Sequence, residues 1–407
     1  MRTRFIIVFF VFITTVSNSF AQYTPFYQWT LLPKLQMDEI VGESSGETAL
    51  NHAIEMVGYQ RNRPASEYGS GTFREGKYVL DKLNEYGING AKIERFEGGE
   101  TWDGIKGELW EISPYKRKLA DYDDIALSLA QGSRPANVTA ELVWIEEGTD
   151  SDFEEVDVKG KIVVTSASVG RVHRTAINNG AVGVVAYGSS RELKAPLAIP
   201  ASGIRGDNAT FGFYLTPRDG YKLRNRLVRG EKITVHAVVE SEMLEYELQI
   251  PTCVIPGTDP NAGEIILSAH IYEGYTKQGA NDNVSGSAVI LEVVRSLNQM
   301  FEDGRLKRPK RGVRFIWVPE YSGTIPWVKE HKHITEQTLC NINLDMVGLH
   351  LKSNNSFFSL MRTTFGNPHY INDVMENYFV FMGEVNREIL ANRSSAQITN
   401  QIIAPSG

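Results

Sequence analysis

The C-terminal part of the chain alternates short apolar strands with a long apolar helix, and this alternation restricts the fold more than any other feature. Residues 265–267, 313–318 and 340–344 are strand-like runs, and residues 284–297 carry apolar side chains at helical spacing. Such alternation is typical of a mostly parallel sheet flanked by helices. We therefore predict an α/β fold whose functional groups lie just beyond the carboxyl ends of the strands.

Residues that can bind a metal ion or transfer a proton stand at the ends of these segments. His270 follows the first strand, Glu320 the second and Asp345 the third, while Asp282 precedes the helix. One imidazole and two carboxylates suit zinc, cobalt or manganese, and Glu320 remains as a carboxylate that can act as a base. Taken singly, Asp282 is more simply a helix N-cap. Together, the four residues predict a metal-dependent hydrolytic site.

The first 21 residues have the pattern of an export signal. Arg2 and Arg4 precede an apolar run over residues 5–13, and Ser19 and Ala21 supply the small residues that a signal peptidase needs. The run is shorter than the roughly 20 residues of a membrane span. We predict removal of residues 1–21 and an exported protein, secreted or periplasmic, without a membrane span; a retained anchor is the alternative.

Changes in composition divide the rest of the chain into three parts. Residues 22–124 begin with predicted helices, and residues 125–243 contain short β-branched strands with few residues suited to catalysis. Residues 244–407 contain the alternating strands and all four candidate site residues. No obvious strand or helix closes this last part at Gly407, so we expect the fold to continue beyond it.

Charge and cysteine content exclude several classes of partner and site. The net charge of −7, with scattered lysine and arginine, predicts that nucleic acid is not a partner. The two cysteines, Cys253 and Cys340, lie in apolar stretches and predict free thiols rather than a disulfide framework. His331 and His333 lie in a charged stretch that we predict to be solvated. Nothing in the sequence indicates an oligomeric state.

Four segments carry a resemblance to a known family. They are residues 268–270 (Ser-Ala-His), 279–286 (Gly-Ala-Asn-Asp-Asn-Val-Ser-Gly), 317–323 (Trp-Val-Pro-Glu-Tyr-Ser-Gly) and 341–348 (Asn-Ile-Asn-Leu-Asp-Met-Val-Gly). In this order they resemble the motifs of secreted M28-family zinc peptidases, and residues 125–243 resemble a protease-associated domain. The resemblance implies a zinc-exopeptidase-like α/β fold, with a mostly parallel mixed sheet and an inserted β-rich protease-associated domain.

The resemblance also implies a role for each matched residue. Asp282 would bridge two zinc ions, and His270 and Asp345 would complete the first of these sites. Glu320 would be the general base that takes a proton from a metal-activated water and passes it to the leaving amine. The implied function is an exported metallopeptidase of the aminopeptidase type, which removes residues from peptides.

The chain departs from the family pattern around the second metal. Tyr321 stands where the family has a second, metal-binding glutamate, and Tyr272, followed by Glu273, stands where the family has an aspartate that orients the histidine. His350 and His369 follow too closely to match the family's last histidine. We therefore predict one complete metal site and leave the second open.

The departures leave roles and functions open. Tyr272, Glu273 and Tyr321 would support the ligands or form a wall for the substrate. One alternative function is a catalytically impaired binding protein that keeps the peptidase fold. Another is a one-metal acyltransferase that resembles glutaminyl cyclases.

Overall fold

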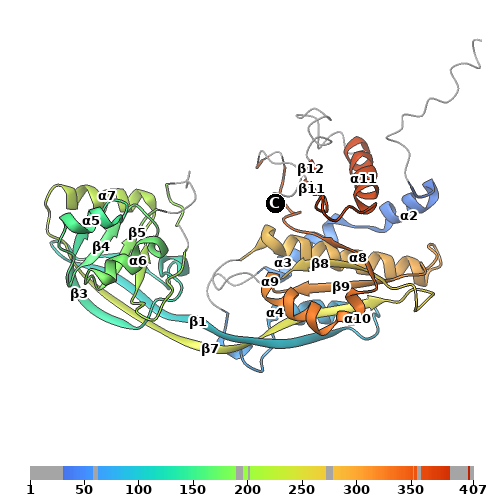
Figure 1. The fold of residues 1–407 in the computed structure, drawn as a ribbon, viewed down its shortest axis with the longest axis horizontal. Coiled ribbons are helices and arrows are strands. Elements are labelled where there is room, and N and C mark those ends of the chain that lie inside the picture. Colours follow the sequence, from blue (N-terminus) through green and yellow to red (C-terminus); the bar gives the residue numbers. More distant parts are fainter. Residues whose placement is uncertain are drawn as a thin grey trace, which may run out of the picture. The chain divides into compact units, whose positions relative to one another are not determined.

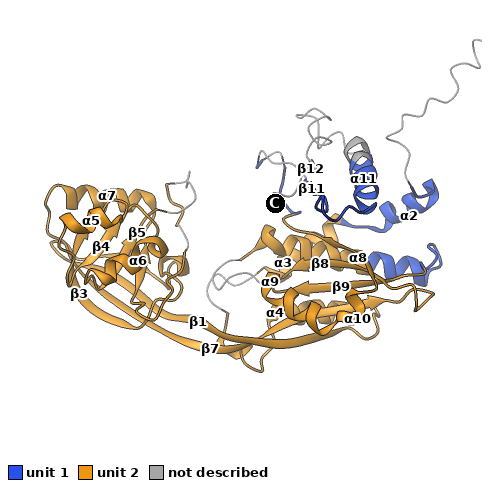
Figure 2. Ribbon diagram, viewed as in Figure 1, with its two compact units in different colours: residues 1–45, 295–309, 347–407 blue, residues 46–294, 310–346 orange. Residues whose placement is uncertain are grey.

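The structure is a computed structural model that describes most of the chain (Figure 1). The described residues are 31–57, 63–188, 196–199, 202–271, 278–351, 353–354, 359–385 and 402–403. The predicted export signal, Tyr272 and Glu273 lie outside them. The chain forms two compact units, distinguished by colour in Figure 2. Unit 1 comprises residues 1–45, 295–309 and 347–407, and unit 2 comprises residues 46–294 and 310–346.

Unit 2 is built on one mixed sheet of ten strands, so the predicted mixed α/β class is confirmed. The central order is β10-β8-β9-β7-β3-β4-β5-β6, with β1 paired to β7 and β2 paired to β1. The strands are β1 (Lys92–Ser113), β2 (Arg117–Asp121), β3 (Ala136–Trp144), β4 (Ile162–Thr165), β5 (Gly183–Ala186), β6 (Gly212–Tyr214), β7 (Thr234–Ile255), β8 (Glu264–His270), β9 (Gly312–Val318) and β10 (Thr338–Asn343).

Helices flank this sheet in the sequence and in space (Figure 1). In unit 2 they are α3 (Gly46–Met56), α4 (Arg74–Glu85), α5 (Asp150–Glu155), α6 (Val169–Asn178), α7 (Pro217–Val228), α9 (Glu320–Glu330) and α10 (Lys332–Thr335). Helix α8 (Ser285–Glu302) begins in unit 2 and ends in unit 1. Unit 1 also contains α2 (Lys34–Glu43), α11 (Ile371–Val385) and the parallel pair β11 (Leu360–Met361) and β12 (Ile402–Ile403).

Strands β1 and β7 are far longer than the sequence predicts. Each strand is 22 residues long, and they pair antiparallel from Lys92 opposite Thr252 to Ser113 opposite Thr234. Part of β1 is rich in glycine and glutamate, which are poor strand formers, so propensity alone misses it. The predicted boundary at residue 243 falls inside β7. The division at residues 125 and 243, and the protease-associated domain, stay predictions.

The strands β8, β9 and β10 run parallel and form the part of the sheet that matters for the site. Side chains of β9 alternate between the two faces. On one face, Ile316 and Val318 pack with Trp327 of α9. On the other, the indole nitrogen of Trp317 donates to the carbonyl of Ser287 in α8 at 3.0 Å. Burial on both faces explains the continuous apolar run Phe315 to Val318 at the end of this strand.

The strands β3 to β6 form a second parallel region, in which every residue of β4, β5 and β6 is buried. In β4, Ile162 and Val164 pack into one core cluster and Val163 packs into another. His173 of α6 is buried and its Nε2 lies 3.0 Å from Thr210 Oγ1. Burial lowers the pKa of His173 to about 4, so it is neutral at physiological pH.

Three further sequence predictions can be checked in these elements. Cys253 and Cys340 are free thiols, as predicted. The charged stretch that contains His331 and His333, residues 329–336, is predicted to be solvated. This prediction is wrong for His331, whose Nε2 lies 2.7 Å from Glu94 Oε2 of β1. Among the residues that the structure describes, none of the helices has the length and apolar character that crossing a membrane requires.

Candidate metal centre

The parallel pairing of β10, β8 and β9 brings the predicted site residues to one edge of the sheet. His270 is the last residue of β8 and pairs with Val318, the last residue of β9. Asp345 lies two residues beyond Asn343, which ends β10 and pairs with Ser268 of β8. The imidazole of His270 therefore lies at the edge of the sheet that is formed by the carboxyl ends of the strands, as the strand–helix alternation predicts.

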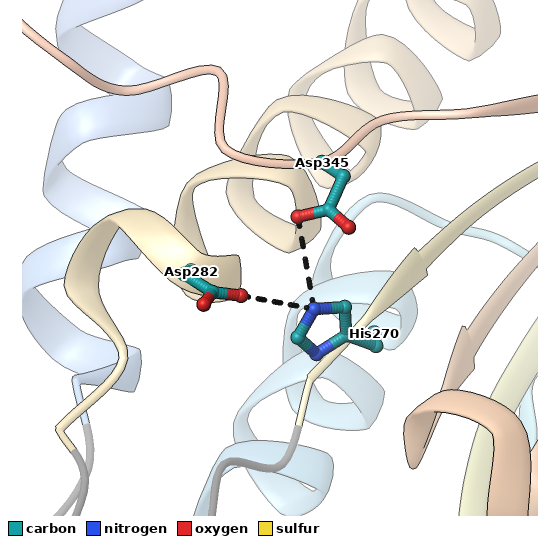
Figure 3. Close-up of side chains that lie close together, drawn as sticks. All are labelled: His270, Asp282 and Asp345. Atoms are coloured by element: carbon teal, nitrogen blue, oxygen red, sulfur yellow. Dashed lines mark ion pairs between the residues drawn. The ribbon is translucent and has the colours of Figure 1, made fainter. Parts of the chain in front are cut away.

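Three of the predicted residues converge in space (Figure 3). The Nε2 atom of His270 lies 3.2 Å from Asp282 Oδ1 and 3.7 Å from Asp345 Oδ1. One ligand atom from each residue lies within 4.8 Å of the other two. Residues 75 positions apart in the sequence thus form one cluster of donors.

The chemistry of this donor set fits a divalent cation. An imidazole nitrogen and carboxylate oxygens are the donors that zinc takes in proteins. Two carboxylates held this close repel each other, and a divalent cation between them removes that repulsion. The His270 side chain is 8% exposed, whereas Asp282 and Asp345 are 38% and 46% exposed. The site therefore has a buried nitrogen donor and two oxygen donors that solvent and substrate can reach.

Hydrogen bonds to the backbone hold the strand ends that carry His270 and Asp345. Ser287 Oγ of α8 donates to the carbonyl of His270 at 2.9 Å. The amide of Leu344 donates to the carbonyl of Ser268 at 2.9 Å, which extends the β10–β8 pairing to the residue before Asp345. Both candidate ligands are therefore attached to the packed core rather than to a freely moving loop.

Asp282 lies in an irregular turn, Ala280–Val284, that leads into α8. The turn follows Gly279, whose φ of 65° favours glycine. The bond that caps the first turn of α8 comes from the next residue: Asn283 Oδ1 accepts from the amide of Gly286 at 3.0 Å. Asn283 therefore supplies a capping hydrogen bond for α8, and the capping interpretation weighed for Asp282 stays a prediction.

Glu320 and Tyr321 lie at the start of α9, directly after β9. Glu320 is exposed, and its φ of 43° places it in the left-handed region, which costs a non-glycine residue roughly 1–2 kcal/mol. Backbone strain of this kind concentrates at functional sites. The three residues whose ligand atoms converge do not include Glu320, and its role as a base stays a prediction. Tyr321 is 77% exposed.

Sequence reasoning missed the residues that support the ligands. Asn283 is fully buried, and so is Ser287. An asparagine that directly follows a candidate ligand and stands three residues before the first helical turn's glycine is a common helix cap. That sequence pattern could have identified Asn283. No local pattern could have identified Ser287, whose partner His270 is distant in sequence.

Comparisons with known proteins agree with this geometry. Residues 252–399, which include His270, Asp282, Glu320 and Asp345, match the model of peptidase family M28. The chain is 28% identical over 240 residues to aminopeptidase YwaD of Bacillus subtilis (strain 168). That alignment covers 55% of this chain and 48% of the relative, so the chain spans about half the length of the curated relative that it matches.

Two solved structures share the fold over most of the chain. An aminopeptidase from Aneurinibacillus sp. strain AM-1 superposes with a TM-score of 0.53 and 22% identity, covering 90% of this chain and 85% of that one. A zinc aminopeptidase from Bacillus subtilis, BSAP, superposes with a TM-score of 0.55 and 19% identity, covering 88% and 83%. At these identities the similarity shows the fold.

Proposed function

We propose that this protein, which carries a peptidase family M28 region at residues 252–399, is an exported metal-dependent exopeptidase of the aminopeptidase type. The observation that carries the proposal is the convergence of His270, Asp282 and Asp345 within 4.8 Å at the carboxyl edge of the sheet. The family match and the aminopeptidase relative support the same class of reaction. Export is part of the proposal and rests on the sequence of residues 1–21.

The three converging residues would hold one zinc ion, for which cobalt or manganese could substitute. When bound, the ion would polarise the scissile carbonyl and lower the pKa of a water molecule. His270 offers a neutral nitrogen, and the two aspartates balance the charge of the cation. Their exposure leaves one side of the site open to a peptide.

Glu320 is the residue proposed to move the proton. It takes a proton from the attacking water and gives it to the nitrogen of the leaving amine, so that the carbonyl carbon gains an oxygen as the C–N bond breaks. Its place two residues beyond Val318, the strand partner of His270, supports this role. Tyr321, the next residue, would form part of the wall that faces the peptide.

The test combines elemental analysis with hydrolysis of a panel of aminoacyl anilides. We expect bound metal in the wild-type protein, and loss of both metal and hydrolysis in His270→Ala. His236→Ala is the matched control, because His236 bonds to Thr139 in the β3–β7 region and should keep both. A wild-type protein without bound metal, after purification in the presence of zinc, would refute the proposal.

A binding protein with the peptidase fold is the second candidate. It is favoured by Tyr321, because a neutral phenol is a poor replacement for the metal-binding glutamate that the family resemblance places there. Metal that is bound by the wild type and lost in His270→Ala, without hydrolysis of any substrate in the panel, would select this candidate.

A further inference from the structure

A single buried amide connects the two segments that carry the aspartates. Asn283 follows Asp282 directly and has no exposed surface. Its Nδ2 donates to the carbonyl of Leu344 at 2.8 Å, and its Oδ1 accepts from the amide of Met346 at 3.2 Å. These two backbone groups lie on either side of Asp345. The same Oδ1 accepts from the amide of Gly286 in α8.

These contacts determine where Asp345 sits relative to Asp282. Asn283 is joined to Asp282 by a peptide bond and to both neighbours of Asp345 by hydrogen bonds. The segment after β10 thus remains attached to the start of α8 at the position of the ligand. Met346 has a φ of 55°, an unfavourable conformation for its residue type, and the bond from its amide to Asn283 helps to hold it.

Glycine at position 286 permits this approach. A Cβ atom added to Gly286 would lie 2.3 Å from the carbonyl oxygen of Leu344 and 2.5 Å from Asn283 Oδ1. Both distances are far below van der Waals contact, and the first involves backbone that cannot turn away as a side chain can. Any side chain at this position would push the two segments apart.

We infer that Asn283 is a positioning residue that sets the separation of the Asp282 and Asp345 carboxylates, and with it the affinity of the site for its metal ion. The inference rests on the proposed metal site and adds a determinant of affinity that does not touch the ion. Both polar side-chain atoms of Asn283 form hydrogen bonds with backbone groups, so neither is required as a ligand. Residues that orient ligands in this way typically change metal affinity by about 10- to 100-fold when they are replaced.

Zinc affinity is the measurement that tests the inference, made by competition with a chromophoric chelator on protein shown to be folded by circular dichroism. We expect Asn283→Ala to bind zinc about 10- to 100-fold more weakly than the wild type. Thr252→Val is the matched control: Thr252 is buried in the same sheet and donates to the carbonyl of Phe315 at 3.0 Å. It should lose stability and keep wild-type affinity.

A second variant keeps the inference testable if Asn283→Ala does not fold. Gly286→Ala removes no polar group and raises helix propensity in α8, so we expect a folded protein, but its added Cβ forces Leu344 and the Asn283 side chain to shift. It should also bind zinc at least about 10-fold more weakly, because it separates the two segments. Folded variants with affinity within twofold of the wild type would overturn the inference. A wild-type protein that binds no zinc would instead refute the proposed function.

Discussion

At the scale of single residues, Glu320 is the group whose role is easiest to separate from metal binding. Glu320→Gln keeps the shape of the side chain but removes its ability to accept a proton. We expect kcat for a hydrolysed aminoacyl anilide to fall about 10²- to 10⁴-fold, the usual contribution of a general base, with metal content unchanged. Glu330→Gln, at the exposed end of the same helix, is the control and should keep wild-type kcat. Loss of metal in Glu320→Gln would show that Glu320 is a ligand.

At the scale of secondary-structure elements, Glu111 joins β1 to α7 and β2. Its buried carboxylate lies 2.6 Å from Arg226 Nη2 of α7 and 2.6 Å from Arg117 Nε of β2. Burial alone would raise the pKa of Glu111, but the hydrogen bonds from Arg226 and Arg117 outweigh it and hold the pKa below its usual value. The stabilisation is therefore present above the unfolded-state pKa of about 4.5 and is lost as pH falls through the lower folded-state pKa.

Urea unfolding of Glu111→Gln measures this contribution. Removing one partner of a buried ion pair leaves the other charge unpaired, and we expect a loss of about 3 kcal/mol at pH 7. This value is at the lower end of the roughly 3–5 kcal/mol that breaking a buried ion pair costs. The reason is that Arg226 keeps its ion pair with Glu231, 2.5 Å away. The difference between variant and wild type should shrink as the pH is lowered below 4.5. Glu242→Gln, exposed on β7, should change the unfolding free energy by less than about 0.5 kcal/mol.

At the scale of the whole molecule, the proposed metal should stabilise unit 2, because its ligands come together only in the folded state. A ligand at 100 times its dissociation constant adds about 2.7 kcal/mol. Chelation of zinc should therefore lower the thermal midpoint of unfolding by about 5 °C for a unit of this size. Tryptophan fluorescence can follow the transition, since Trp102, Trp110, Trp144, Trp317 and Trp327 all belong to unit 2. His270→Ala should show no change on chelation; an equal change there would place the stabilising ion elsewhere.

Local sequence patterns predict that the elements around the site exist, but they predict the length of the long strands poorly. Apart from Arg314, residues 313–318 are apolar because both faces of β9 are covered, and the predicted strand matches β9 within one residue. The pattern is weaker for β1, where Gly98 and Gly99 interrupt it. The pairing with β7 skips Gly98 and continues at Gly99, and that partner strand lies about 150 residues away in sequence.

In the candidate site too, the sequence predicts some features and misses others. His270, Asp282, Glu320 and Asp345 could be selected because polar residues at the ends of apolar strands are unusual and occur in a recognisable order. The convergence of His270, Asp282 and Asp345 could not be read from spacing, because it depends on the order β10-β8-β9 in the sheet. The capping role also required coordinates, since Asp282 and Asn283 are adjacent and both are good capping residues.

Residue identity and local periodicity were sufficient to predict the candidate ligand types, their order along the chain, the strand–helix alternation and the resemblance to M28 peptidases. Which donors meet, which amide lies between them and how far β1 and β7 extend became known from the folded chain alone. Those properties depend on hydrogen bonds and packing between segments far apart in the chain, and a linear pattern does not contain the register that produces them.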